Sequence, residues 1–398
     1  MAKTRIGIWL VGAKGGVATT SIVGLIALKK GLIDTAGLVS QLPQFQNLAL
    51  TDWKNFVVSG HEIRDVSLVE AAERLADDNR AIDPKLVAKC RSELQKIDQR
   101  IRPGTLHKVG KTIAALAAKD IPREESPRQA IDRLQQDLVD FVESEKLQHV
   151  IVVNVASTEP AVDTAAIPES WDALKPLLEK PRKCPLPASS LYAIAALELG
   201  HSYVNFTPSL GSAPAAIDEL ARLRATRHAG CDGKTGETLM KSVLAPMFAR
   251  RNMPVMSWVG HNIFGNLDGK VLDDPINKRT KVASKDRLLG EIFGYQPQTH
   301  VSIEYIESLG DWKTAWDHIH FSGFLGTPMT LQFIWHGSDS VLAAPLVLDL
   351  VRFTDLARQR AWTGRMTFLA SFFKSPIGVD EHRFDRQFQM LEDWAAQG

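Results

Sequence analysis

Short apolar runs alternate with helical patterns through the first two thirds of the chain. The segment from Arg128 to Glu145 carries apolar residues near a 3.6-residue spacing, which predicts an amphipathic helix. Alternation of such helices with apolar strands predicts an α/β fold built on a doubly wound parallel sheet. The apolar runs that we expect to form buried strands begin at Ile6, Leu38, His149, Ser202 and Met253.

The pattern changes after Met256. "HVSIEYIESLG" from His300 and "MTLQFIWHG" from Met329 alternate apolar and polar residues, which is typical of half-exposed antiparallel strands. The tail returns to helices, and an amphipathic stripe is predicted from Pro345 onward. We therefore expect a discontinuous first domain of residues 1–240 and 335–398, and a second, smaller α+β domain of residues 241–334.

The net charge, the cysteines and the lengths of the apolar runs limit which kinds of binding partner and which location we expect. The 398 residues include 47 Lys and Arg against 46 Asp and Glu, so a net charge of +1 favours neither nucleic acid nor an anionic membrane surface. Cys90, Cys184 and Cys231 lie far apart, which argues against a disulfide framework and a structural zinc site. No apolar run reaches the roughly 18 residues of a membrane-spanning helix. These features predict a cytoplasmic protein without export signal or membrane anchor.

A glycine-rich loop follows the first predicted strand. In "WLVGAKGGVATT", Gly12, Gly15 and Gly16 come directly after the apolar run, and a helical pattern starts near Ala18. This order suits a pyrophosphate, because glycines let the backbone approach the ligand and helix-start N–H groups face the anion. Lys14 occupies the place of the second glycine of G-x-G-x-x-G, so a purely structural turn remains an equal alternative.

Two later strands are also followed by loops rich in small polar residues. "NVASTEP" follows the strand at His149, and "NFTPSLGSAP" lies between the strand at Ser202 and a helix expected near Pro214. Carboxyl ends of parallel strands meet at one edge of a sheet, so these loops are candidates for binding an anionic group. A turn with a helix N-cap is the alternative for the second loop.

A local excess of positive charge stands out in this neutral chain. Between Lys270 and Arg287 there are six cations and three anions, and Lys281 and Lys285 are four residues apart, on one helix face. A solvated basic surface is the commoner cause of such a run. Two further lysines, Lys313 and Lys374, lie in apolar or aromatic company, where a lysine needs a partner or a function. We expect these lysines to form an electrostatic site for an anionic substrate together with candidate carboxylates, which are Asp232, Asp268, Asp311 and Asp339.

Nine segments, in order from about residue 5 to about residue 380, carry a family resemblance. They are "WLVGAKGGVATTSIVG", "NVASTEP", "NFTPSLGSA", "HAGCDGKTGETLMKSVLAPMF", "GNLDGKVL", "SKDRLLGEIFGY", "HFSGFLGTPM", "AAPLVLDLVRF" and "FFKSP". Together they resemble the myo-inositol-1-phosphate synthase family, most of all its shorter archaeal and bacterial members. The resemblance implies a Rossmann-like NAD-binding domain, a catalytic and tetramerisation domain, a homotetramer, and isomerisation of D-glucose 6-phosphate to 1D-myo-inositol 3-phosphate.

The resemblance also implies roles for individual residues. The cofactor would be held by Gly12, Gly15, Gly16, Val17, Ala18, Thr19, Ser40, Asn154, Ser157, Thr158 and Asp232. The substrate would be bound by Asn205, Ser209, Gly211, Asn262, Asn266 and Asp311. The catalytic set would be Lys281, Lys285, Lys313, Lys374, Asp232, Asp268 and Asp339. Departures from the family pattern are Gly260-His261 in place of Ser-Tyr, and Leu267.

The implied chemistry recycles the cofactor: oxidation at C5, enolisation at C6, aldol closure onto C1 and reduction by the same NADH. "GLVSQLPQF" offers Ser40 and Gln41 where many dinucleotide folds have an acid, and no arginine follows, so we expect NAD rather than NADP. A plain sugar-phosphate dehydrogenase, a related carbocyclic-phosphate synthase and a non-enzymatic dinucleotide sensor are the alternatives. A divalent or monovalent cation beside the phosphate stays open, because no dense ligand motif is present.

Overall fold

A computed structural model describes residues 5–266, 269 and 288–397. Its largest feature is a parallel sheet of seven strands in the order β11-β6-β5-β4-β1-β2-β3, which confirms the predicted doubly wound class. The strands are β1 (Ile6–Val11), β2 (Phe56–Glu62), β3 (Arg102–Pro103), β4 (His149–Asn154), β5 (Ser202–Asn205), β6 (Arg227–Gly230) and β11 (Gly364–Arg365).

Helices cover both faces of this sheet, so its central strands β1, β4 and β5 are buried along their whole length. In β1, Ile6, Ile8 and Leu10 belong to one hydrophobic core, whereas Trp9 and Val11 belong to the other. The first core is closed by α1 (Gly16–Lys30), α2 (Leu68–Asp77), α3 (Pro84–Asp98), α12 (Asp339–Gln359) and α13 (Phe384–Ala396). The second is closed by α5 (Pro127–Glu145), α6 (Trp171–Leu174), α7 (Ala188–Glu198) and α8 (Ala215–Leu223), with α4 (Lys111–Ala114) at its margin.

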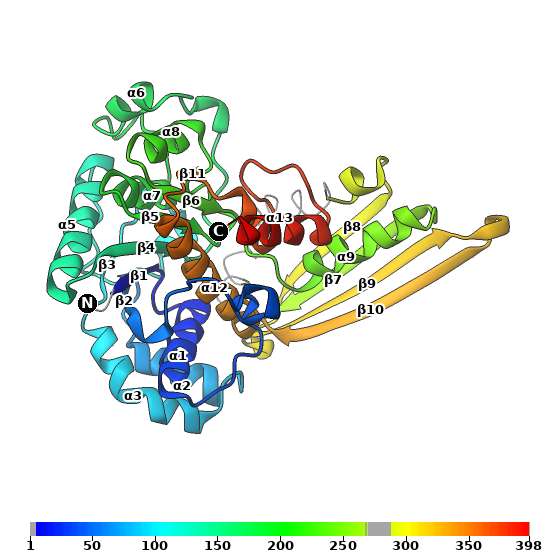
Figure 1. Cartoon of the computed structure of the whole chain (residues 1–398), viewed down its shortest axis with the longest axis horizontal. Helices are drawn as coiled ribbons and strands as arrows, with labels where there is room; N and C mark the ends of the chain where they lie inside the picture. The colour runs from blue at the N-terminus through cyan, green and yellow to red at the C-terminus, as the bar shows by residue number, and fades with distance from the viewer. Residues whose placement is uncertain (1–4, 267–268, 270–287, 398) are drawn as a thin grey trace.

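A second, four-stranded sheet has the order β10-β9-β7-β8. Its long strands β9 and β10 run out from the body as an extended hairpin, with α9 (Gly236–Arg250) alongside (Figure 1). Ala245 and Phe248 of α9 pack on Trp258 and Ile319, so one face of the sheet is covered. The strands are β7 (Val255–Phe264), β8 (Gln298–Tyr305), β9 (Trp312–Ser322) and β10 (Pro328–Ser338).

One strand direction in this sheet was predicted wrongly. β10 is antiparallel to β9 as expected, but β8, the strand near His300, pairs with β7 in parallel. Alternation of apolar and polar residues reports a half-covered face and says nothing of strand direction. β7 ends at Phe264 and β8 begins at Gln298, a separation in sequence that exceeds the dozen or so residues a parallel pair requires.

The strand predicted at Leu38 is also wrong. Residues Val39–Gln41 form a short 3₁₀ turn, and the backbone N–H groups of Val39 and Ser40 donate to the Asp349 carboxylate of α12. The strand beside β1 is β2, whose sequence FVVSGHE conceals it because its last four residues are small or polar. All seven are nevertheless buried.

The C-terminal segment contributes to the parallel sheet. β11 pairs with β6, and α12 packs against α1. The amphipathic stripe predicted from Pro345 is wrong, because every residue from Val347 to Ala357 is buried and the helix begins at Asp339.

The predicted domain boundaries fall inside α9 and β10, and the division of the chain at these points stays a prediction. Within the described residues, no helix has the length and apolar character needed to cross a bilayer.

Candidate active site

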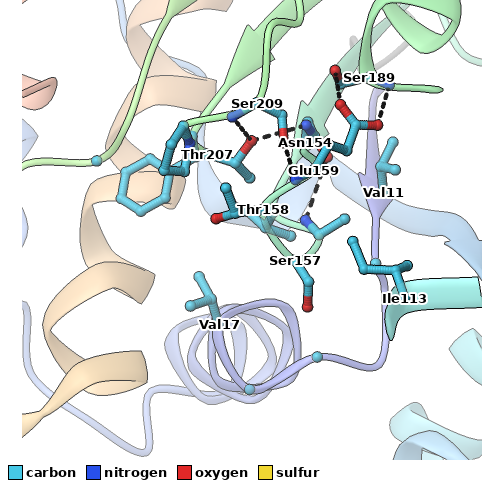
Figure 2. A pocket seen from close by; sticks show the side chains of 18 of the residues that line it. Val11, Val17, Ile113, Asn154, Ser157, Thr158, Glu159, Ser189, Thr207 and Ser209 are labelled. Carbon is cyan, nitrogen blue, oxygen red and sulfur yellow. Dashed lines mark hydrogen bonds between the residues drawn. The ribbon is translucent and has the colours of Figure 1, made fainter. Parts of the chain in front are cut away.

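A cavity opens at the carboxyl ends of β1, β2, β4 and β5, where the sheet brings the predicted loops together. Val11, Val17 and Ile113 give it an apolar wall, and the loops after β4 and β5 give it a polar one (Figure 2). Asn266 and Lys313 of the second sheet region also line it, as does Asp339 at the start of α12. The cavity therefore joins the dinucleotide edge of the parallel sheet to the other half of the molecule.

The glycine loop has the geometry of a close-approach turn. Gly12 has φ 81°, and a Cβ there would lie 2.8 Å from the Cα of Ala156, so only glycine fits. Gly15 is the N-cap of α1 and makes no side-chain cap, which leaves the first N–H groups of that helix for a ligand. Gly12, Gly15, Gly16 and Val17 line the cavity. Ala18 and Thr19, also predicted to bind cofactor, are fully buried behind the loop.

The sequence missed the acid at the end of β2. Glu62 lines the cavity at the carboxyl end of the strand beside β1, the place where this fold class carries its ribose-binding acid. Arg64, two residues later, lines it too and forms an ion pair with Glu62 at 3.0 Å. Ser40 instead accepts a hydrogen bond from Arg352 inside the α12 interface. Ser40 therefore does not line the cavity, whereas the end of the strand beside β1, which the sequence analysis did not single out, brings both an acid and an arginine to it.

The loops after β4 and β5 are joined by a hydrogen-bond network. Asn154 Nδ2 donates to Asn205 Oδ1 at 3.1 Å and to Thr207 Oγ1 at 3.2 Å, and the Ser209 N–H donates to Thr207 Oγ1. Figure 2 shows Asn154, Thr207 and Ser209 converging beside Thr158. Asn154, Ser157, Thr158 and Ser209 line the cavity, as predicted from their loops, whereas Asn205 and Gly211 stand directly behind it.

Glu159 anchors this network on one side. Its carboxylate accepts hydrogen bonds from the backbone N–H of Ser189 at 2.8 Å and the hydroxyl of Ser189 at 2.5 Å, at the start of α7 (Figure 2). The Ser209 hydroxyl accepts from the Glu159 N–H at 3.0 Å. Burial raises the pKa of Glu159 to about 7, although these hydrogen bonds favour the ionised form.

The charged end of the cavity contains two of the four predicted lysines. Lys374 Nζ lies 2.8 Å from Asp232 Oδ1, which confirms a carboxylate partner for this lysine. Lys313 Nζ lies 5.0 Å from the centre of the Phe264 ring. Asp339 Oδ2 accepts from Asn266 Nδ2 at 3.3 Å.

Asp311 lies beside this charged end and supports the start of α12. Its carboxylate accepts hydrogen bonds from the N–H and hydroxyl of Ser340 and from the Ser338 hydroxyl. Burial raises the pKa of Asp311. Asp311 and Ser340 both line the cavity, so this carboxylate fixes the wall where the two sheets approach each other.

Some predicted site residues lie elsewhere. Asn262 is fully buried and donates to Glu237 Oε2 at 2.6 Å, away from the cavity lining. A Cβ at Gly260 would lie 2.6 Å from Glu237 Oε1, which accounts physically for the glycine at this departure from the family pattern. Predicted positions outside the described residues are Lys281, Lys285, Asp268 and Leu267. Lining residues that the sequence did not reveal include Glu62, Arg64, Ser189, Tyr192, Ser340 and Ala343.

The fold and the cavity define a dinucleotide-binding protein whose cofactor edge leads into a lysine–carboxylate site. More narrowly, the chain belongs to the myo-inositol-1-phosphate synthase family, an NAD-binding family whose sequence model matches residues 6–396. It is 33% identical to inositol-3-phosphate synthase 1 of Bacteroides thetaiotaomicron, over 96% of this chain and 92% of that one. The identity to the inositol-3-phosphate synthase of Spirodela polyrhiza is 27%, over 89% and 74% of the two chains.

Solved structures show the same fold. The inositol-3-phosphate synthase of Caenorhabditis elegans superposes with a TM-score of 0.87 at 23% identity, over 99% of this chain and 85% of that chain. A myo-inositol-1-phosphate synthase-related protein of Thermotoga maritima gives 0.81 at 24% identity, over 98% of both chains. At these identities the likeness supports the fold alone.

Proposed function

We propose that this protein is an NAD-dependent isomerase that converts D-glucose 6-phosphate to 1D-myo-inositol 3-phosphate. The observation that carries the proposal is the meeting, in one cavity, of a dinucleotide loop with Lys313 and the Lys374–Asp232 pair. Membership of the family and the names of its curated relatives, inositol-3-phosphate synthases, support the same activity.

The residues present fit a dinucleotide. The glycine loop and the uncapped start of α1 would hold the pyrophosphate, and Glu62 would accept hydrogen bonds from the adenosine ribose. Asn154, Ser157 and Thr158 would border the nicotinamide ribose. When bound, the cofactor would supply the hydride acceptor for C5 and, in its reduced form NADH, the hydride for the later reduction.

The lysines would stabilise negative charge on substrate oxygens. We assign Lys313, with Lys281, to O5, Lys374 to O1 and Lys285 to the phosphate. Asp232, at 2.8 Å, would hold the Lys374 ammonium in place. A fixed cation at a developing oxyanion is typically worth about 2.7–4 kcal/mol, so each lysine placed at a substrate oxygen would lower the barrier by about that amount.

The test is to incubate the protein with glucose 6-phosphate and NAD and to identify the product by phosphorus NMR and mass spectrometry. We expect inositol phosphate with no net rise in NADH absorbance. Stoichiometric NADH release would show a plain sugar-phosphate dehydrogenase instead. NAD binding without any product would support a non-enzymatic dinucleotide sensor.

We further propose a homotetramer in the cytoplasm, the state that the family resemblance implies. Sedimentation velocity tests the assembly, and a monomer would contradict it. A divalent or monovalent cation beside the phosphate is a candidate only: in the described part of the chain no group of three or more His, Cys, Asp or Glu side chains is arranged to hold a metal ion. Activity measured after dialysis against a chelator, and again after adding back Mg²⁺ or K⁺, tests it.

A further inference from the structure

One buried carboxylate joins the loops after β4 and β5 to the start of α7. Glu159 follows β4, is 7% exposed and lines the cavity. Its Oε1 accepts from the backbone N–H of Ser189, and its Oε2 accepts from the Ser189 hydroxyl (Figure 2). The N–H of Glu159 donates to the Ser209 hydroxyl, in the loop after β5. Both carboxylate oxygens are therefore engaged by the same residue of α7.

The Ser189 hydroxyl also contacts the loop after β5. While it donates to Glu159, its oxygen accepts the backbone N–H of Gly211 at 3.0 Å. Gly211 lies so close to Asn205 that a Cβ there would be 2.5 Å from Asn205 Nδ2. Asn205 Oδ1 accepts from the hydroxyl of Thr207 at 2.8 Å, and Thr207 lines the cavity. A continuous series of contacts thus leads from Glu159 to the polar wall of the cavity.

We propose that Glu159 is a positioning residue for this polar wall, which it holds in place by fixing the direction of the Ser189 hydroxyl. The inference rests on the proposed function, which assigns the wall to the nicotinamide and the substrate. A carboxylate can only accept, so the Ser189 proton points to Glu159 and the hydroxyl lone pairs remain for Gly211. A neutral carboxyl group has a proton of its own, which competes for the same hydroxyl oxygen. The wall is therefore held best when Glu159 is ionised.

The surroundings of Glu159 bring its ionisation close to neutral pH. Burial raises its pKa to about 7, although the hydrogen bonds of Ser189 and Ser209 favour the ionised form. The ionisable groups that face it are two phenols, Tyr192 of α7 and Tyr203 of β5. Burial raises the pKa of both phenols further above 10, so they stay neutral while Glu159 titrates. A change in activity near pH 7 can therefore report on the state of this carboxylate.

A second buried carboxylate supplies a matched control. Asp349 of α12 accepts from the backbone N–H groups of Val39 and Ser40 at 2.6 and 3.1 Å, and burial raises its pKa to about 6. Like Glu159, it fixes a neighbouring segment through backbone and serine contacts, but it does not line the cavity. Asp349→Asn therefore removes a comparable buried carboxylate without touching the polar wall.

The experiment measures the pH dependence of kcat and KM with glucose 6-phosphate and NAD. Wild-type kcat should fall toward acid pH with a midpoint near 7. Glu159→Gln should abolish that midpoint and lower kcat by roughly tenfold, with KM nearly unchanged, the scale for one hydrogen bond that positions a reacting group. Ser189→Ala should move the midpoint upward, because the lost hydroxyl favoured the ionised form. Asp349→Asn should keep the wild-type profile.

A binding measurement separates this inference from the proposed function. The emission of bound NADH should change with the same midpoint in wild type and should be independent of pH in Glu159→Gln. A wild type that binds NADH without forming inositol phosphate overturns the proposed function, and the NADH emission then decides the role of Glu159. A wild type that does not bind NADH overturns both.

Other outcomes contradict the role of Glu159 alone. These are a wild-type profile without a midpoint near 7, a midpoint that persists in Glu159→Gln, and a loss of stability in that variant with unchanged kcat. Should Glu159→Gln fail to fold, Ser189→Ala decides the question: an upward shift of the midpoint supports the inference, and an unshifted midpoint overturns it.

Discussion

Among the lysine–carboxylate pairs of the molecule, one lines the cavity and another is enclosed in the protein interior. Lys374 and Asp232 are 2.8 Å apart and both line the cavity. Lys241 and Glu237 are 2.6 Å apart, with side chains 2% and 1% exposed, between α9 and β7, where Trp258 lies near the ammonium group. The distances are nearly equal, so an ion pair by itself does not mark an active site. Because Lys374 lines the cavity, its positive charge can interact with a bound ligand. The charge of Lys241 is enclosed, so we expect it to contribute to the stability of the fold.

The largest expected effect is a loss of stability when the enclosed Lys241–Glu237 pair is broken. Lys241→Met keeps the volume but leaves Glu237 without its buried cation, and breaking such a pair typically costs about 3–5 kcal/mol. Urea denaturation followed by circular dichroism measures the loss. The double variant Lys241→Met/Glu237→Gln should recover part of it, because the stranded charge is then gone. An unchanged midpoint for Lys241→Met would contradict the structural role.

At the Lys374–Asp232 pair, which lines the cavity, we expect substitution to lower activity more than stability. We expect Lys374→Met to lower kcat by about 10²–10³, the scale for one oxyanion contact, and to cost less stability than Lys241→Met, because Asp232, with 8% of its side chain exposed, lines the cavity. Steady-state assays of product formation and urea denaturation measure the two quantities. A wild-type kcat, or a stability loss as large as that of Lys241→Met, would erase the distinction between the two pairs.

Two titratable histidines, His149 and His201, lie near the amino-terminal ends of the parallel strands, away from the lining of the cavity. His149 and His201 lie edge to face, and burial lowers the pKa of His201 to about 4 and that of His149 well below 6.5. The unfolded chain binds these protons first, so stability should be full above pH 6.5 and fall as the pH drops toward 4, by at most about 3 kcal/mol for His201. Urea midpoints from pH 7.5 to 4 test this. His201→Phe should flatten the dependence, and an unchanged slope would refute the assignment.

The smallest expected effect comes from adding a methyl group at Gly12, in the cavity wall, compared with the same change at Gly31, at the end of a helix. Gly12→Ala places a side chain at φ 81° against Ala156 and should cost about 1–3 kcal/mol, besides weakening NADH binding. Gly31→Ala is the control: its φ is 65°, it ends α1, and no atom lies within 4 Å of the added Cβ. Gly31→Ala should show the backbone cost without loss of NADH binding, measured by fluorescence titration. Equal binding in both variants would argue against a close approach at Gly12.

Local pattern was enough to predict much of the parallel sheet. The apolar runs of β1 and β4 lie between helices and are buried on both faces, so their continuous hydrophobicity predicts central strands. The loop residues Gly12, Asn154 and Ser209 could be named as cavity lining because loops after parallel strands share one edge. The expectation that Lys374 needs a partner or a function followed from the cost of an isolated buried charge, and the structure gives it Asp232 as partner.

Pattern failed where polar side chains are buried with specific partners. β2 was missed because Ser59, His61 and Glu62 interrupt its apolar run, yet each finds a partner from a distant part of the chain. The stripe predicted in α12 was wrong for the same reason: Asp349 and Arg352 face the segment at residues 39–51 rather than water.

By itself the sequence determined the alternation of strands and helices, the glycine loop and the lysines, because each depends on residues close together in the chain. Only the tertiary structure decided that Glu62 and Arg64, rather than Ser40, line the cavity, since this depends on which strand lies beside β1. It also decided which lysine pairs face a cavity. Both outcomes depend on contacts between segments far apart in the chain, such as Asp232 with Lys374, 142 residues away, which no local spacing encodes.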